Sequence, residues 1–136
     1  MANSSQKPAK VKLSTRKPVS DARLLKLWRE RVFERAKHKC EYPGCKVASN
    51  WLHPHHWVYR RHAMTRYDPD NGLALCATHH VFGECAAHQD PNFKDIILNS
   101  EVRSLSWHEN LMKKRNETVK NNQAFKEMWL EKLLFT

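Results

Sequence analysis

The side chains that could do chemistry gather in the middle of this 136-residue chain. Seven of the nine histidines and all four cysteines lie between positions 40 and 88. Imidazole and thiolate are the side chains that bind zinc and other transition metals. Residues 1–20 lack the apolar segment of a secretory signal, so we expect the thiols to be reduced. Spaced cysteines with interspersed histidines then favour zinc over disulfides.

Two residue pairs have the spacing of a tetrahedral zinc site. Cys40 and Cys45 flank a Pro-Gly turn, and Cys76 and His79 are separated by two residues. Three sulfurs and one imidazole suit a structural zinc ion, which contributes folding free energy in a small domain. Cys85 is the competing fourth ligand. It lies nine residues past Cys76, and we expect it to be an ordinary buried thiol.

Adjacent histidines indicate a second site beside the zinc. His79 and His80 would point about 100° apart on a helix, so one can join the zinc ligands while its neighbour faces elsewhere. His55 and His56 end a strand-like segment and would point to opposite sides of a regular strand. Both can reach one metal only if the strand ends or turns there, which the preceding proline favours.

The order of these residues resembles the ββα-metal core of HNH endonucleases, and it is most similar to the zinc-containing forms that phages encode. The similarity covers residues 38–92 and includes the arginine-rich loop before Asn71. The segments that carry it are His55-His56-Trp57, Asn71-Gly72-Leu73 and Leu75-Cys76-Ala77-Thr78-His79-His80.

The resemblance implies a catalytic set of His56, Asn71 and His80. His56 would be the general base that takes a proton from the attacking water. His80 would hold a divalent metal that bridges the scissile phosphate. Asn71 would tie the loop together through its side-chain amide, and so hold the backbone of the base.

One position departs from the family pattern. The family usually has an aspartate immediately before the general base, as second ligand of the catalytic metal, and here that position is His55. Imidazole favours Mn²⁺ or Ni²⁺ over Mg²⁺, so we expect activity with Mn²⁺ or Ni²⁺ at least equal to that with Mg²⁺. His53 lies one strand period away and is a weaker ligand candidate, for which we favour solvent exposure.

The charge of the chain indicates a polyanionic partner. Lysine and arginine number 24 against 14 acidic residues, a formal charge of +10. Basic side chains on backbone phosphates supply sequence-independent affinity for DNA. We expect Arg60, Arg61 and Arg66 to contact the DNA backbone, because they lie between the implied base and the next turn. His62 and His88 are interpreted as structural or exposed.

The elements that must position these residues surround the core segment. We expect a basic tail over residues 1–20 and a basic amphipathic helix over 21–39, capped by Ser20 or Asp21. A zinc-stapled core over 40–92 follows, with a strand over 51–59 and a short helix over 73–82. Residues 93–136 form a helical extension, with helix starts at Asp90-Pro91 and at Ser104 or Ser106.

These patterns predict an α+β protein, with a small ββα-metal core and a structural zinc flanked by helices on both sides. All residues after 20 form one compact domain. Its mean hydropathy of −0.77 and the lack of a long apolar run argue against a membrane span. The resemblance implies a cytoplasmic enzyme encoded by a phage or mobile element, which cuts DNA to leave 5′-phosphate and 3′-hydroxyl ends.

The oligomeric state, monomer or homodimer, stays open at this stage. One catalytic set would nick a single strand, so a double-strand break needs a dimer or two events. Two other functions also stay open. One is a non-catalytic zinc-dependent DNA-binding module, since Cys40, Cys45, His56 and His62 approach the spacing of a C₂H₂ finger. The other is a degenerate HNH protein that kept zinc and lost catalysis.

Overall fold

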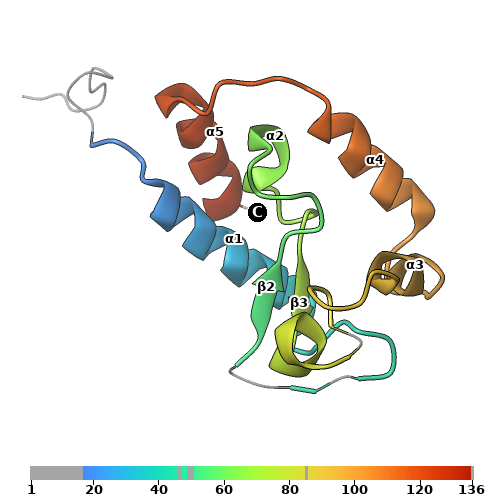
Figure 1. The fold of residues 1–136 in the computed structure, drawn as a ribbon. Coiled ribbons are helices and arrows are strands. Elements are labelled where there is room, and N and C mark those ends of the chain that lie inside the picture. The colour runs from blue at the N-terminus through green and yellow to red at the C-terminus, as the bar shows by residue number, and fades with distance from the viewer. Residues whose placement is uncertain (1–16, 46, 49–50, 85, 136) are drawn as a thin grey trace, which may run out of the picture.

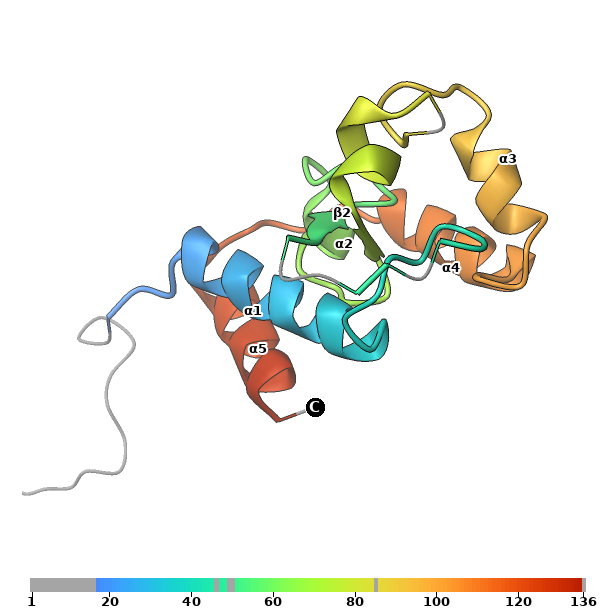
Figure 2. The ribbon, with the colours of Figure 1, turned by 90° about the horizontal axis from the view of Figure 1, so that it is seen from below.

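The computed structural model describes residues 17–45, 47–48, 51–84 and 86–135. This part of the chain is a small α+β fold with a two-stranded antiparallel sheet and several helices. In Figures 1 and 2 the sheet lies between two groups of helices. On one side α1 (Asp21–Arg35) packs against α5 (Gln123–Leu134), and on the other lie α3 (Phe93–Leu98) and α4 (Leu105–Arg115). Most of the expected basic tail lies outside the described residues.

The sheet consists of β2 (His53–His55) and β3 (Leu73–Leu75). His53 is opposite Leu75 and His55 is opposite Leu73, so both histidines project from the same face of β2. The short helix α2 (Ala63–Arg66) lies in the loop between the strands, and η2 (Thr78–Phe82), a π-helical turn, follows β3. The order strand, strand, helical turn therefore forms the centre of the molecule.

The helix that we expected over residues 73–82 is wrong in its first part, because residues 73–75 form strand β3. Leu73, Ala74 and Leu75 are fully buried, so the strand shows none of the polar–apolar alternation that marks a half-exposed strand. The helical part begins only at Thr78. The expected strand over 51–59 is likewise shorter than predicted, since β2 ends at His55.

Helix α1 is capped by Ser20, one of the two residues predicted to cap it. The Ser20 side chain accepts a hydrogen bond from the Arg23 backbone N–H at 3.1 Å, which satisfies one of the free N–H groups of the first turn. The helix ends at Arg35 rather than near residue 39. Lys37 and His38 have φ values of 57° and 58°, which an α-helix cannot continue through.

Trp28 and Val32 of α1 pack directly on the backbone of Gly72, at the start of β3. A Cβ atom added to Gly72 would lie 2.5 Å from Val32 Cγ2 and 3.0 Å from Trp28 Cζ2. Only glycine permits this approach. The Trp28 indole N–H also donates to the Asp68 carbonyl at 2.9 Å, so α1 is fixed against the turn that precedes β3.

Helix α3 begins at Phe93, after the expected start at Asp90-Pro91, and has no side-chain cap. Helices α4 and α5 begin at side-chain caps. The Ser104 hydroxyl accepts from the Trp107 N–H, and the Asn122 amide oxygen accepts from the Phe125 N–H. The face of α5 that contains Phe125, Trp129 and Leu133 is buried against α1. Within the described ranges, none of the helices combines the length and apolar character needed to cross a membrane.

Candidate functional site

Four side chains converge between the end of α1, strand β3 and η2. The Sγ atoms of Cys40, Cys45 and Cys76 and a ring nitrogen of His79 all lie within 4.8 Å of one another. Cys45 Sγ is 3.9 Å from Cys76 Sγ, and His79 Nδ1 is 3.3 Å from Cys76 Sγ and 3.7 Å from Cys40 Sγ. A zinc ion with bonds of about 2.3 Å would separate tetrahedral sulfurs by about 3.8 Å. The cluster could therefore bind a metal ion such as zinc.

Local hydrogen bonds hold the two halves of this cluster together. The Cys40 N–H donates to the Val47 carbonyl at 2.9 Å and closes the cysteine knuckle. The Glu41 N–H donates to the Ala74 carbonyl, and the Ala74 N–H donates back to the Glu41 carboxylate. The knuckle is thus attached along β3, so Cys40 lies beside Cys76 at the end of that strand.

The cluster is partly buried, with Cys40 its one buried member. Burial raises the pKa of the Cys40 thiol to about 12, although backbone hydrogen bonds from Cys76 and Tyr42 act in the opposite direction. A bound cation would reverse this shift, because thiolates bind metals only in the deprotonated form. The Tyr42 ring lies flat on the His79 imidazole, with ring centroids 4.1 Å apart.

A second cluster contains three histidines: His55 from β2, His80 from η2 and His88 from the loop after η2. One ring nitrogen of each lies within 4.8 Å of the others, and His80 Nε2 is 3.0 Å from His88 Nε2. Nitrogen ligands with bonds of about 2.1 Å to one metal lie about 3.0 to 3.4 Å apart. The donor set therefore fits a divalent transition metal.

Both inner histidines are neutral, as metal ligands must be. Burial, followed by the neighbouring His80 and His88, lowers the pKa of His55 to about 3. Burial, followed by His88 and His53, lowers the pKa of His80 to about 4. Neutral imidazole keeps a lone pair on one ring nitrogen, so the cluster can bind a cation without first releasing protons.

His53 lies behind His80 and fixes the orientation of its ring. The two Nδ1 atoms are 2.9 Å apart. If His80 binds a metal through Nε2, its Nδ1 carries the proton and donates to His53. His53 was expected to face solvent, but it is partly buried here because it shares the inner face of β2 with His55.

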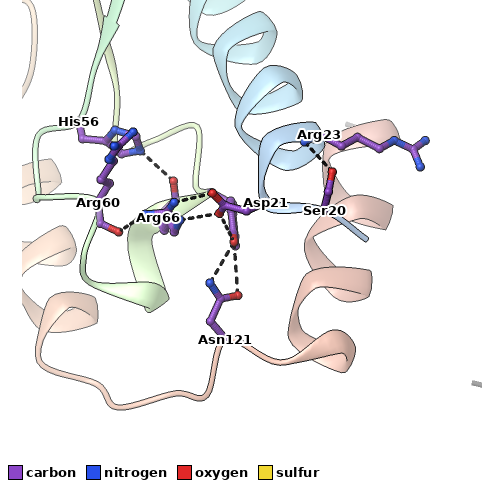
Figure 3. A network of polar contacts seen from close by, with 8 residues as sticks. Ser20, Asp21, Arg23, His56, Arg60, Arg66 and Asn121 are labelled. Atoms are coloured by element: carbon purple, nitrogen blue, oxygen red, sulfur yellow. Dashed lines mark hydrogen bonds and ion pairs between the residues drawn. The ribbon is translucent and has the colours of Figure 1, made fainter. Parts of the chain in front are cut away.

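His56 lies beyond the end of β2 and belongs to neither cluster. Its ring stacks on Trp28, with centroids 3.8 Å apart and planes inclined by 8°. Its Nε2 is 2.9 Å from the Arg66 carbonyl oxygen, as Figure 3 shows. A carbonyl oxygen only accepts, so Nε2 carries the proton and Nδ1 keeps the lone pair. Burial and the charges of Arg66 and Arg60 lower the His56 pKa to about 4, so the ring is neutral at physiological pH.

Asn71 is fully buried, and both ends of its side-chain amide form hydrogen bonds to the backbone of the loop between β2 and β3. Its Oδ1 accepts from the Val58 N–H at 2.6 Å, and its Nδ2 donates to the Val58 and Thr65 carbonyls. Val58 is two residues after His56, so these bonds fix the backbone that carries the implied base. The amide does not belong to the histidine cluster.

The structure gives Arg66 partners other than the phosphate that we expected. Its guanidinium forms two hydrogen bonds with the Asp21 carboxylate, at 2.7 and 2.6 Å, and a third with the Arg60 carbonyl (Figure 3). These bonds attach α2 to the first turn of α1. Arg66 therefore positions its own carbonyl against His56, and three of its five guanidinium N–H groups are engaged within the chain.

Arg60 and Arg61 remain available at the surface. Both are exposed, and both line a hollow of about 400 Å³ that also contains His55, His56 and His80. Arg60 lines a second hollow on the other side of His56, beside α1. His56, members of the histidine cluster and two exposed arginine side chains therefore share one open hollow.

Sequence reasoning did not identify His88 as a ligand. The chain returns to the histidine cluster because the Ala87 and His88 N–H groups donate to the His79 and His80 carbonyls, at 2.8 and 3.1 Å. No spacing rule signals this return across eight residues. The competing ligand Cys85 lies outside the described residues.

The described residues do not bring together the alternative C₂H₂ set. Cys40 and Cys45 are grouped with Cys76 and His79, whereas His56 is occupied by Trp28 and the Arg66 carbonyl. His62 lies at the start of α2. Among the described residues, Cys40, Cys45, His56 and His62 therefore do not form the metal site that their spacing approached.

Comparisons of the chain with models of known protein families, with curated proteins and with solved structures found no match.

Proposed function

We propose that this protein is a metal-dependent endonuclease of the HNH kind, which hydrolyses phosphodiester bonds in DNA. The observation that carries the proposal is the shared hollow: His56, with its proton fixed on Nε2, lines it together with His55 and His80 of the histidine cluster. Phosphodiester hydrolysis needs a base for water and a cation for the phosphate, and these groups supply both at one surface.

His56 is the proposed general base. The Arg66 carbonyl orients the ring and determines which nitrogen accepts, as a backbone carbonyl does for many functional imidazoles. Trp28 prevents the ring from rotating, and Asn71 holds the following backbone. His56 Nδ1 would take the proton of a water molecule as that water attacks phosphorus, and water or the leaving strand would later remove it.

The histidine cluster is the proposed binding site of the catalytic metal ion. A divalent metal bound there would neutralise the scissile phosphate and stabilise charge on the leaving 3′-oxygen. His55, His80 and His88 would hold it, and His53 would orient His80. An all-imidazole set suits Mn²⁺ or Ni²⁺ better than Mg²⁺, which prefers oxygen ligands.

The cysteine cluster is proposed to hold a structural zinc. Its four ligands leave no open position for a substrate. Because His79 and His80 are adjacent on η2, zinc bound at His79 would also help to position His80. DNA is the proposed substrate since the chain is strongly basic and since Arg60 and Arg61 border the hollow.

Nicking of supercoiled plasmid tests the proposal. The full-length protein and its His56→Ala variant are incubated with plasmid in Mg²⁺, Mn²⁺ or Ni²⁺, and open-circular product is measured over time. We expect metal-dependent nicking by the wild type and a loss of about 10² to 10⁴-fold in the variant. Mn²⁺ or Ni²⁺ should support at least the rate seen with Mg²⁺.

A control substitution tests whether replacing a histidine outside the proposed site also lowers nicking. His38 is exposed and has a φ of 58°, which asparagine tolerates, so His38→Asn should nick at the wild-type rate. Zinc content and thermal unfolding are measured for both variants. Equal nicking by wild type and a folded His56→Ala protein would overturn the assignment of the base, and absence of nicking with every metal would overturn the endonuclease.

A further inference from the structure

One exposed aromatic ring on the border of the histidine hollow has no role in the proposed hydrolysis. Tyr59 leaves 64% of its surface exposed, follows His56 by three residues and lines the hollow beside Arg60 and Arg61. We propose that Tyr59 is a stacking platform for an unpaired nucleobase, so that the site takes single-stranded DNA. This inference rests on the proposed function and names the substrate class.

The backbone beneath Tyr59 is fixed on both sides. Val58, which precedes it, is buried and bonded to Asn71 through both its N–H and its carbonyl. The Tyr59 carbonyl accepts from the His62 N–H at 3.1 Å. An exposed ring on an anchored backbone loses little conformational freedom when it binds, which is the property of a stacking platform.

Tyr59 also stands between two basic hollows. The histidine hollow lies on one side, and a smaller hollow of about 90 Å³ on the other is lined by His62, Lys94 and Arg115 among others. No carboxylate lines either hollow among the residues that the structure describes. The Arg61 guanidinium lies over one face of the Tyr59 ring, 5.4 Å from its centroid, so a base would stack on the opposite face. Cations on both sides of an exposed ring match a strand whose phosphates flank a stacked base.

The geometry favours an unpaired base over a duplex. In double-stranded DNA the faces of the bases are covered by their neighbours, so an aromatic side chain reaches a face only where a base has left the stack. Phosphate contacts alone would not distinguish the two forms of DNA. Tyr59 is the group that would make this distinction.

Binding of matched oligonucleotides tests the inference. Fluorescence anisotropy is measured for full-length, zinc-loaded protein with a labelled single strand and with its duplex, without other added divalent metal. We expect Tyr59→Ala to weaken single-strand binding by about 5- to 150-fold and duplex binding by less than about twofold. Tyr59→Trp should restore the single-strand affinity, since the indole also stacks.

The control is Phe135→Ala, an exposed aromatic after α5 that lines neither hollow; it should bind both forms of DNA as the wild type does. Unchanged single-strand affinity in Tyr59→Ala, or equal losses with both forms, would overturn the inference. Plasmid nicking that depends on His56, together with either result, would leave the endonuclease intact. Tyr59-dependent binding without cleavage of either plasmid or single-stranded DNA would overturn the endonuclease and support the stacking site.

Discussion

The cysteine cluster and the histidine cluster differ in access, although adjacent residues of one helical turn contribute to both. His79 faces three thiols, of which Cys40 is buried, in a set of four donors. His80 lies against His55 and the exposed His88 beside an open hollow of about 400 Å³. A closed set of four ligands suits a structural ion, and a set of three beside open space suits an ion that exchanges water for substrate.

One short element, η2, contributes to both clusters. Its successive side chains point in different directions, so a single turn divides its imidazoles between two sites. Substitutions in the cysteine cluster should therefore unfold the protein. Substitutions in the histidine cluster should lower activity and leave the protein folded.

The largest effect is expected from Cys76→Ser, which removes a thiolate from the cysteine cluster. Structural zinc supplies about 10–16 kcal/mol in small zinc domains, more than the total stability of a typical domain. We expect loss of bound zinc and of cooperative thermal unfolding, measured by elemental analysis and circular dichroism. Cys85→Ser is the matched control and should keep both. Stoichiometric zinc in a folded Cys76→Ser protein would contradict the division between the clusters.

Asn71→Ala should weaken the loop below the open site without disturbing the zinc. It leaves the Val58 N–H and two buried carbonyls without partners, which costs about 2–4 kcal/mol. Urea denaturation measures this change, and nicking should fall because His56 loses its anchored backbone. Asn71→Asp keeps the acceptor but turns a carboxylate oxygen toward two carbonyl oxygens in a buried position, so it should cost at least as much. A loss of zinc from folded Asn71→Ala would show that the two regions are coupled through this loop.

His53→Ala sharpens the comparison within the histidine cluster. Removing the group that orients a metal-binding imidazole weakens metal affinity by about 10- to 100-fold. The Mn²⁺ concentration that gives half-maximal nicking should rise by that factor, whereas zinc content and maximal rate stay close to wild type. His38→Asn removes an exposed histidine outside the cluster and both hollows, and it is the control. An unchanged Mn²⁺ requirement would exclude His53 as the orienting residue.

Asp21→Asn is expected to have a small effect and to spare both clusters. Its ion pair with Arg66 lowers the Asp21 pKa from 3.8 to about 2. Because 39% of its side chain is exposed, we expect a loss of only about 1 kcal/mol at pH 7. The contribution is complete above the unfolded pKa and is lost only as the pH falls from about 4 towards 2.

The unfolding free energies of wild type and Asp21→Asn should therefore differ by the same amount at pH 7 and pH 5, in urea titrations. A difference that shrinks within this range would show that the carboxylate is not held by Arg66. Glu34→Gln breaks an exposed pair with Arg31, in which Glu34 is 58% exposed, and should cost less than about 0.5 kcal/mol.

Local spacing was enough to predict the cysteine cluster. Cys40 and Cys45 share one knuckle, Cys76 and His79 share one turn, and the structure brings these two pairs together. The cap of α1 at Ser20 was likewise a local signal, and it is confirmed with Ser20 as the acceptor. Structural features that depend on residues close together in the sequence can therefore be predicted from the sequence.

Features that depend on distant partners could not be predicted. Arg66 meets Asp21 across 45 positions, and nothing near Arg66 distinguishes that contact from a free guanidinium. Strand β3 has no alternation because tertiary packing buries both of its faces. His88 reaches its cluster only because the loop after η2 folds back on that turn.

The π-helical form of η2 has a consequence for natural variation in chain length. Its wide turn is closed by the Gly83 N–H on the Thr78 carbonyl at 2.8 Å, five residues apart, and such turns contain one residue more than an α-helical turn. A substitution here would affect one cluster, but a deletion between Cys76 and His80 would rotate the following imidazoles by about 100° and remove them from both clusters together. We expect related chains to vary in residue type along this stretch and not in its length.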